Sequence, residues 1–221
     1  MSESVFGPEY LKIQTVFKRD ERNVIIPGDW STDEMAYLVD AQWSWTEKVD
    51  GTNIRLHWNG ENITVGGRTD SAQIPSHLLT HDVLGRLNDP ALWQSIFPES
   101  NNATVYGEGY GPKIQSGGHY RPDHAFVVFD VRVGDWWLKP DAVNDVAEKL
   151  GLQVVPSRGE MTLREAVEVV RNRSIESSWE GARIEGLVGR PCVDLYSRKG
   201  ERIIAKVKVK DFIDYERRSR P

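Results

Sequence analysis

The stretch Glu47-Lys48-Val49-Asp50-Gly51-Thr52-Asn53 joins two segments of different character. It follows an apolar, aromatic run, Trp43-Ser44-Trp45, and it leads into a short polar turn. A lysine at the end of such a run is expected to be partly buried. Burial and nearby positive charge favour the neutral amine, which is the nucleophilic form. Lys48 is therefore a candidate nucleophile rather than a solvated surface charge.

The composition is that of an ordinary globular protein. The chain has 221 residues, of which 39% are hydrophobic and 28% are charged, and we expect a single domain over residues 1–221. No apolar run is long enough to span a membrane, and no secretory signal opens the sequence. The lone cysteine, Cys192, excludes an intramolecular disulfide and a cysteine-based metal cage. These features predict a cytoplasmic protein.

Positive charge is concentrated near the C-terminus. Residues 181–221 hold 11 basic and 6 acidic residues, although the whole chain has a net charge of −5. Such a segment could bind a polyphosphate, and it could equally be a solvated fluctuation in charge.

Short runs rich in β-branched and aromatic residues predict that strands dominate the fold. Asn59-Gly60 and Gly134-Asp135 predict hairpin turns between neighbouring strands. Several runs alternate apolar with polar residues, as half-buried antiparallel strands do. The expected strands cover residues 12–17, 43–49, 53–58, 63–66, 104–108, 125–133, 183–188 and 202–209.

Fewer segments predict helices. Ser31 with Glu34, and Thr162 with Glu165, have the spacing of a capping box at a helix start. Pro140 and Gly151 bracket a helix over residues 141–150, and residues 77–87 and 90–97 are further candidates. The mixture predicts an α+β fold with antiparallel sheets.

A second lysine cluster, Lys206-Val207-Lys208-Val209-Lys210, alternates strictly with valine. In one strand all three lysines would point to the same face. Three like charges on one face favour an anion opposite them, such as a triphosphate or a nucleic-acid backbone. The alternative is an exposed edge strand that lysines protect from aggregation. The pattern alone favours neither.

Three carboxylates lie in expected strands, where apolar residues would be more usual. They are Glu108 in Val105-Tyr106-Gly107-Glu108-Gly109-Tyr110-Gly111, Asp130 after an apolar run, and Glu185 in Ile184-Glu185-Gly186-Leu187-Val188. Buried carboxylates need partners, for which a metal, a ribose hydroxyl or the lysines are candidates. Each alone is more often part of a structural ion pair.

With Lys48 these residues form a set that resembles the covalent nucleotidyltransferases, the superfamily of ATP-dependent RNA and DNA ligases and mRNA capping enzymes. Lys48-Val49-Asp50-Gly51 is similar to their Lys-x-Asp-Gly signature. The blocks around Arg68, Glu108, Asp130, Glu185 and Lys206-Val207-Lys208 follow in family order. Asp-Gly-Thr-Asn and the Val-Lys-x-Lys-Asp-Phe ending are most similar to the nick-sealing, phage-type branch of RNA ligases.

The resemblance implies an adenylyltransferase (ATP-grasp-like ligase) core of antiparallel sheets flanked by helices. It implies that Lys48 attacks the α-phosphate of ATP to form a lysyl-AMP. The implied nucleotide-binding residues are Glu47, Asn53, Arg68, Glu108, Phe129, Lys206 and Lys208. Among them Glu108 would bind the ribose, Phe129 would stack on adenine, and Asn53 and Arg68 would contact phosphate. Glu185 and Asp130 would organise Mg²⁺ or Mn²⁺.

The implied reaction joins a 3′-hydroxyl to a 5′-phosphate at a nick or at other juxtaposed RNA ends. Only 13 residues follow Lys208, so we expect no OB-fold and no other C-terminal accessory domain. An accessory protein could take its place, or Phe17-Lys18-Arg19, Lys113 and Arg217-Arg218-Arg220 could grip the RNA. The alternatives are a DNA ligase, a GTP-dependent capping enzyme, and an RNA-end-binding module without sealing activity.

Overall fold

The computed structural model describes residues 4–219, which fall into two compact units. The first unit contains the N-terminal segment up to Leu11 and Asp50–Val155, and the second contains Lys12–Val49 and the chain from Pro156 onward. The chain passes from the second unit to the first between Val49 and Asp50, two residues after Lys48. That the two units work as a single domain stays a prediction.

The first unit is built on a six-stranded sheet with the order β10-β8-β7-β5-β6. The sixth strand, β9, pairs with the last two residues of β8, Arg132 and Val133. All neighbours are antiparallel except β10 and β8. The strands are β5 (Thr52–Trp58), β6 (Ile63–Gly67), β7 (Ala103–Tyr110), β8 (Ala125–Val133), β9 (Trp136–Trp137) and β10 (Gln153–Val154). Both expected hairpin turns are confirmed, since β5 leads to β6 and β8 leads to β9.

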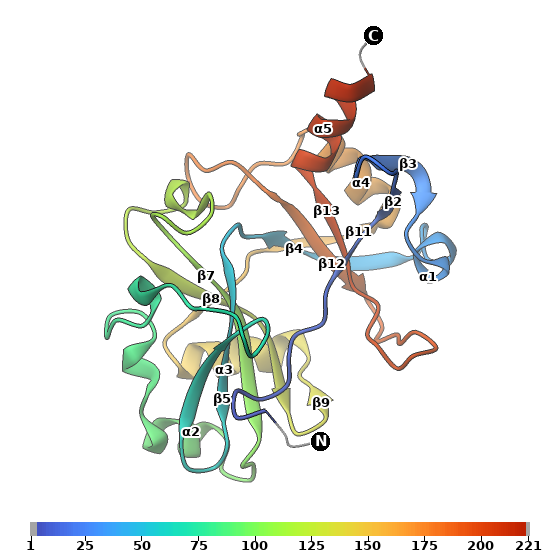
Figure 1. Cartoon of the computed structure of the whole chain (residues 1–221). Helices are drawn as coiled ribbons and strands as arrows, with labels where there is room; N and C mark the ends of the chain where they lie inside the picture. The colour runs from blue at the N-terminus through green and yellow to red at the C-terminus, as the bar shows by residue number, and fades with distance from the viewer. Residues whose placement is uncertain (1–3, 220–221) are drawn as a thin grey trace. The chain divides into compact units, whose positions relative to one another are not determined.

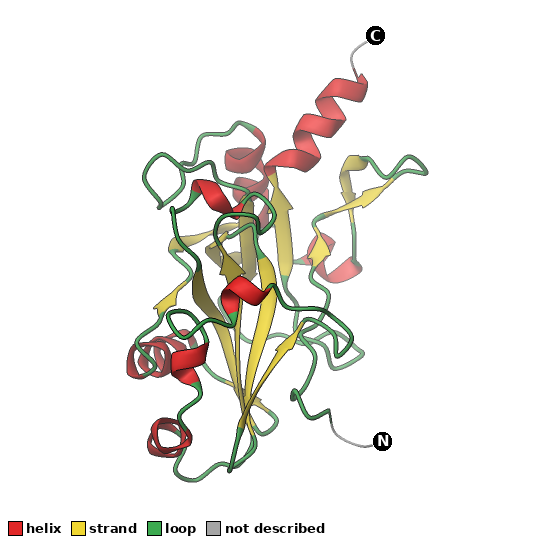
Figure 2. Cartoon of the chain, turned by 60° about the vertical axis from the view of Figure 1, so that its left-hand side comes forward, coloured by secondary structure: helices red, strands yellow, loops and turns green. Residues whose placement is uncertain are grey.

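One face of this sheet packs on the core of the first unit. Ile54, Leu56 and Trp58 alternate along β5 and are fully buried there, as the period of a strand requires. Two helices cover this core, α2 (Pro90–Ile96) and α3 (Pro140–Lys149). Figure 2 shows the strands in yellow and these short helices in red. The predicted helix after Pro140 is confirmed, and Gly151 follows it with a φ of +65°.

The predicted helix over residues 77–87 is wrong. The segment instead forms two short 3-10 turns, η1 (Ser76–Leu78) and η2 (Gly85–Leu87). A glycine inside a helix costs about 1 kcal/mol relative to alanine, and Gly85 lies in the last turn of the expected helix. Leu78, Leu84 and Leu87 still reach the core from the two turns.

The second unit is built on a five-stranded sheet with the order β1-β13-β12-β4-β11. Its neighbours are antiparallel except β1 and β13. Figure 1 shows β4, β12 and β13 together, with α5 running directly from the end of β13. The strands are β1 (Gln14–Thr15), β4 (Gln42–Lys48), β11 (Ser157–Thr162), β12 (Gly186–Pro191) and β13 (Ala205–Lys208), and β2 (Phe17–Arg19) with β3 (Ile25–Trp30) forms a separate hairpin.

Three helices complete the second unit, α1 (Asp33–Tyr37), α4 (Leu163–Arg171) and α5 (Val209–Ser219). Trp43 and Trp45 are fully buried, together with Leu187 and the apolar side of α4. The sheets and helices confirm the α+β class. None of the helices within residues 4–219 is long and apolar enough to cross a membrane.

Three expected strands of this unit have different bounds. The strand expected over residues 12–17 divides at Val16, which donates to the Lys206 carbonyl and accepts from Ser31, so the chain leaves one sheet for the other. The strand expected over residues 183–188 begins only at Gly186. The strand expected over residues 202–209 is confined to Ala205–Lys208, because Val209 already begins α5.

One of the two expected capping boxes is correct. At α4 the Thr162 hydroxyl accepts from the Glu165 amide, and the Glu165 carboxylate accepts from the Thr162 amide. At α1 the cap is Thr32, not Ser31, and it accepts from the Met35 amide. Ser31 instead donates its hydroxyl to the Thr15 carbonyl.

Replacing Thr162 by alanine should lower the free energy of unfolding by about 1 kcal/mol, because the amide of Glu165 loses its cap. Thr162→Ser keeps the hydroxyl and is the matched control. Urea unfolding followed by circular dichroism measures both. Equal midpoints for Thr162→Ala and the wild type would contradict this account of the start of α4.

Candidate active site

The three strands β4, β12 and β13 bring three lysines to one face of the second unit's sheet. Gly186 is the register partner of Lys48 on one side and of Lys208 on the other. Val188 is in the same way the partner of Thr46 and Lys206. Directly opposite residues in antiparallel strands point to the same face. Lys48, Lys206 and Lys208 therefore share one face, which we call the lysine face.

A carboxylate is paired with the candidate nucleophile. The Nζ atom of Lys48 lies 2.7 Å from Oε2 of Glu185, and the two side chains are 23% and 21% exposed. Glu185 directly precedes β12, and its carbonyl accepts a hydrogen bond from the amide of Val209 at 2.9 Å. Glu185 is thus tied to both Lys48 and the start of α5.

The tight pairing of these strands requires glycine after Glu185. A Cβ atom at Gly186 would lie 2.0 Å from the carbonyl oxygen of Val207. In the first unit, a Cβ atom at Gly51 would lie 2.3 Å from the carbonyl oxygen of Gly109. The glycines of the Lys-x-Asp-Gly and Glu-Gly motifs are therefore needed for close backbone approach.

Crowding of positive charge changes the acidity of Lys206. Its burial, followed by the charges of Lys48 and Lys208, lowers the pKa of Lys206 from 10.5 to about 8. Glu185 and Asp211 act in the opposite direction on this pKa. An anion bound to the lysine face would relieve the repulsion and raise the pKa of Lys206 again. The arrangement suits a ligand with several negative charges.

The edge-strand alternative for these lysines is wrong, because β13 lies between β1 and β12. The expectation that Lys210 shares the face is also wrong. β13 ends at Lys208, and Lys210 is an exposed residue of α5.

Glu47 lies on the opposite side of β4 from Lys48. Its register partner is Leu187, which belongs to the core. Its side chain is fully buried and accepts hydrogen bonds from Arg158 at 2.8 Å, the Ser177 hydroxyl at 2.6 Å and the Ser178 amide at 2.8 Å. These contacts anchor the segment that precedes Glu185 to β4. These contacts favour a positioning role for the Glu47 side chain. Direct binding of the nucleotide by Glu47 stays a prediction.

In the first unit, two of the predicted residues lie beside each other. Asn53 on β5 is the register partner of Glu108 on β7. The Oδ1 atom of Asn53 is buried and has no hydrogen-bond partner among the described residues, which leaves an acceptor available to a ligand. Arg68 is exposed and directly follows β6, whose Gly67 pairs with Ile54.

Phe129 and Asp130 are covered by Tyr10 from the N-terminal segment. The Tyr10 hydroxyl donates to Oδ2 of Asp130 at 2.8 Å, and Asp130 is fully buried. The ring centroid of Tyr10 lies 5.0 Å from that of Phe129 and 5.7 Å from that of Trp137. This environment favours a structural role for Asp130, and its metal-binding role stays a prediction.

The donor set of the lysine face suits a magnesium or manganese ion only with help from a ligand. No group of three or more histidine, cysteine, aspartate or glutamate side chains is placed to hold a metal within residues 4–219. Mg²⁺ is commonly bound by one or two carboxylates together with substrate phosphates. Glu185 fits that role.

Sequence reasoning missed several residues that hold the predicted ones. Arg158 binds Glu47, Asp211 binds Lys208, and Tyr10 covers Asp130. Of the three, only Asp211 lies in a motif, the Val-Lys-x-Lys-Asp-Phe ending, which by itself assigns no role to it. Arg55 was also missed. It is fully buried in β5, donates to the Gly7 carbonyl at 2.7 Å and pairs with Asp70.

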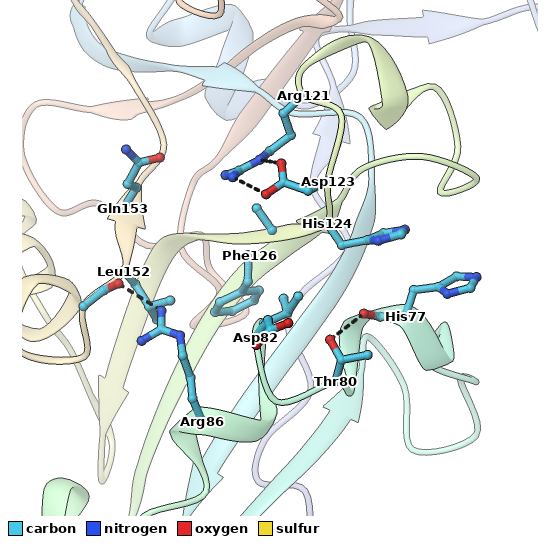
Figure 3. A pocket seen from close by; sticks show the side chains of 13 residues that line it. His77, Thr80, Asp82, Arg86, Arg121, Asp123, His124, Phe126, Leu152 and Gln153 are labelled. Atoms are coloured by element: carbon cyan, nitrogen blue, oxygen red, sulfur yellow. Dashed lines mark hydrogen bonds and ion pairs between the residues drawn. The ribbon is translucent and has the colours of Figure 1, made fainter.

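The first unit also has a polar cavity of about 520 Å³, shown in Figure 3. His77 and His124 stack there with ring centroids 4.9 Å apart, and Arg121 pairs with Asp123. Arg86 donates to the carbonyls of Leu150 and Gly151. The lining includes none of the predicted site residues, and both arginines bind protein groups.

Lys206→Met should stabilise the second unit at pH 7 by about 1–2 kcal/mol after allowance for solvent screening. The folded pKa of about 8 lies below the unfolded value of 10.5. The unfolded chain therefore binds more protons between these pH values, and stability rises with pH across that window. The gain from Lys206→Met should consequently be complete at pH 7 and smaller at pH 10.

Urea unfolding at the two pH values measures this difference, with Lys210→Met as the control for loss of an exposed lysine. A gain that is the same at pH 7 and pH 10, or the same in both variants, would show that Lys206 is not strained by its neighbours.

The sequence model of the RNA ligase family matches residues 41–208. No curated protein is significantly similar to the chain in sequence. The fold is similar to that of a Naegleria gruberi RNA ligase with PPi, with a TM-score of 0.66 and 17% identity over 97% of this chain and 59% of that one.

Variants of the same ligase give comparable results. One with AMP and Mn has a TM-score of 0.66, and one with ATP and Mn has a TM-score of 0.65, each with 16% identity over 96% of this chain and 59% of the ligase. The present chain thus spans less than two thirds of these ligases, and the likeness shows the fold. Because the family model covers most of the sequence, including Lys48 and Lys208, the chain belongs to the RNA ligase family.

Proposed function

We propose that the chain is an ATP-dependent RNA ligase that joins 3′-hydroxyl and 5′-phosphate ends through a lysyl-AMP intermediate. The observation that carries this proposal is the lysine face, where Lys48 lies beside Glu185 and on the same side as Lys206 and Lys208. Membership of the RNA ligase family supports it. So does the set of ligands in the similar structures, which are ATP, AMP, PPi and Mn.

In the first step, the neutral amine of Lys48 attacks the α-phosphorus of ATP. A nitrogen–phosphorus bond forms, the bond from the α-phosphorus to the bridging oxygen breaks, and pyrophosphate leaves. The amine loses a proton to solvent. In the ligand-free chain the Glu185 carboxylate binds the Lys48 ammonium group. Attack requires that this pair separates, which an incoming cation at Glu185 would favour.

Lys206 and Lys208 would neutralise charge on the phosphates during this step. Phosphoryl transfer depends on positioning and on charge stabilisation more than on covalent help from the protein. The lowered pKa of Lys206 fits this role, because it reflects burial beside other positive charges, and a bound anion would raise it. Glu185 would hold Mg²⁺ or Mn²⁺, which when bound would neutralise phosphate oxygens.

The predicted residues of the first unit would bind the nucleoside of ATP and a phosphate of the nucleotide or of the RNA 5′ end. Glu108 would accept hydrogen bonds from the ribose hydroxyls, and Phe129 would stack on the adenine. Asn53 offers a buried acceptor that has no hydrogen-bond partner within residues 4–219. Arg68, which is exposed, would contact a phosphate of the nucleotide or of the RNA 5′ end.

In the later steps, an oxygen of the RNA 5′-phosphate attacks the phosphorus of lysyl-AMP, and the bond to the Lys48 nitrogen breaks. The 3′-hydroxyl then attacks the activated 5′-phosphate, a phosphodiester forms and AMP leaves. The substrate would be a nicked duplex or another pair of juxtaposed RNA ends. A cytoplasmic location and an accessory protein in place of a further domain stay predictions.

Some of the basic residues expected to grip RNA already have protein partners. Lys18 pairs with Asp29 at 2.7 Å, Arg19 pairs with Asp211 at 2.7 Å, and Arg218 donates to the Arg22 carbonyl. Lys113 is exposed, and Arg220 lies outside the described residues. Of the proposed RNA contacts, Arg19 is the least suited, because its partner Asp211 is buried.

Lys48→Ala should abolish transfer of radioactivity from α-labelled ATP to the protein, since no other amine replaces the nucleophile. The wild type, incubated with the labelled ATP and Mg²⁺, should carry a label that survives a denaturing gel. Lys210→Ala removes an exposed lysine and is the control that should keep the label.

The same assay separates the alternatives. Label from GTP alone would indicate a capping-type nucleotidyltransferase. The absence of label from both nucleotides would leave an RNA-end-binding module and would overturn the proposal.

Sealing should be fastest on a nick with RNA on both sides of the break. A panel of nicked duplexes with RNA or DNA in each strand, analysed by gel electrophoresis, measures this preference. Faster sealing of all-DNA nicks would move the assignment to a DNA ligase. Labelled protein with no sealing of any duplex would show that strand joining needs a further component.

A further inference from the structure

We propose that Asp211 is a positioning residue, whose carboxylate holds Lys208 at the lysine face while Arg19 fixes that carboxylate from the other side. The inference rests on the proposed function, because its expected effect is on the formation of lysyl-AMP. Asp211 is the aspartate of the Val-Lys-x-Lys-Asp-Phe ending, a pattern that by itself assigns no role to it.

Asp211 is one of the few charged residues buried in the second unit, with 7% of its surface exposed. Its two carboxylate oxygens have different partners. Oδ1 lies 3.4 Å from the Nζ atom of Lys208, and Oδ2 lies 2.7 Å from an Nη atom of Arg19. A buried carboxylate is stable only when such partners satisfy it. Asp211 therefore links Lys208 to the β2–β3 hairpin.

The surrounding packing fixes the position of this carboxylate. α5 begins directly after β13, so only two residues separate Lys208 from Asp211. The next residue, Phe212, is buried against Phe17 with ring centroids 6.4 Å apart. The amide of Val209 donates to the Glu185 carbonyl. The start of α5 is thus held on one side by the hairpin and on the other by the residue that pairs with Lys48.

Arg19 holds the carboxylate without competing for the lysine face. It donates to the Asn23 carbonyl at 2.9 Å through its other terminal nitrogen. Its guanidinium group therefore bridges the hairpin turn and Asp211. Removal of Arg19 would weaken the docking of α5 and would leave Asp211 with Lys208 alone.

Asp211 also acts on the charge of the lysine face. Four charged groups change the pKa of Lys206. Lys48 on β4 and Lys208 on β13 lower it, and Glu185 before β12 and Asp211 on α5 raise it. Of these, the two carboxylates favour the protonated form of Lys206. Loss of the Asp211 charge should leave Lys208 less firmly placed and Lys206 more easily deprotonated.

The test compares single-turnover rates of lysyl-AMP formation with α-labelled ATP in the full chain. Asp211→Asn should lower the rate at neutral pH by about tenfold, the effect of losing one charge-assisted contact in the transition state. Its rate should also begin to fall at a lower pH on the alkaline side. Glu216→Gln removes a carboxylate of α5 that pairs with Arg173 at the surface, and it should stay within about twofold of the wild type.

Arg19→Gln distinguishes positioning from simple stability. It removes the group that fixes the Asp211 carboxylate but keeps the contact of that carboxylate with Lys208, so its adenylylation rate should fall less than that of Asp211→Asn. If Asp211→Asn does not fold because Arg19 is left unpaired, the double variant Arg19→Gln/Asp211→Asn removes that unpaired charge. The double variant should then fold, and it should still show the tenfold loss and the altered pH profile.

A rate loss in Arg19→Gln equal to that in Asp211→Asn would overturn the inference in favour of a purely structural role. A labelled wild type together with an unaffected Asp211→Asn would overturn it as well, and the proposed function would stand. An unlabelled wild type would overturn the proposed function and this inference with it.

Discussion

Repulsion among three lysines on one face of a sheet is the constraint around which the second unit is organised. Lys48, Lys206 and Lys208 come together because β12 pairs with β4 on one side and with β13 on the other. Like charges this close are unfavourable in the absence of an anion. Two carboxylates offset them, Glu185 at Lys48 and Asp211 at Lys208. The Asp211 carboxylate is in turn bound by Arg19 on β2, and the backbone carbonyl of Glu185 accepts from the amide of Val209.

The same constraint explains why the opposite face of that sheet is so firmly built. Trp45, Leu187 and Val207 fill it, and the one charged residue in their row, Glu47, is fully buried and satisfied by Arg158, Ser177 and Ser178. β4 therefore presents the candidate nucleophile Lys48 on one face and the buried, hydrogen-bonded Glu47 on the other. The first unit follows the same plan, with an apolar face on β5 and polar residues, among them Asn53, that alternate with it.

The sequence predicted the class of the fold and the family well, because both depend on local patterns. Strand periodicity, the Thr162 capping box and the order of the motif blocks all lie in short stretches of chain. The predicted bounds of secondary structure were wrong where contacts between residues far apart in sequence determine them. β13 ends at Lys208 because the amide of Val209 donates to the carbonyl of Glu185 instead of continuing the strand. The segment over residues 77–87 places three leucines in the core from the short turns η1 and η2 and from Leu84 between them, not from one helix.

Among the site residues, the motifs indicated the groups that carry charge but not the groups that hold them. Tyr10 and Arg158 are far in sequence from the residues they bind, so no spacing rule could connect them, whereas Asp211 is three positions from Lys208 but was assigned no role by its motif. Glu47 shows the limit most clearly. The resemblance implies that it binds nucleotide, which stays a prediction, and strand alternation places its side chain on the buried face.

The central claim is that Lys48, and no other amine of the lysine face, becomes covalently bound to AMP. Intact-mass measurement after incubation with ATP and Mg²⁺, followed by peptide mapping, tests it most directly. The account predicts a mass increase of one AMP per chain, located on the peptide at Lys48. AMP on Lys206 or Lys208, or no mass increase at all, would contradict it.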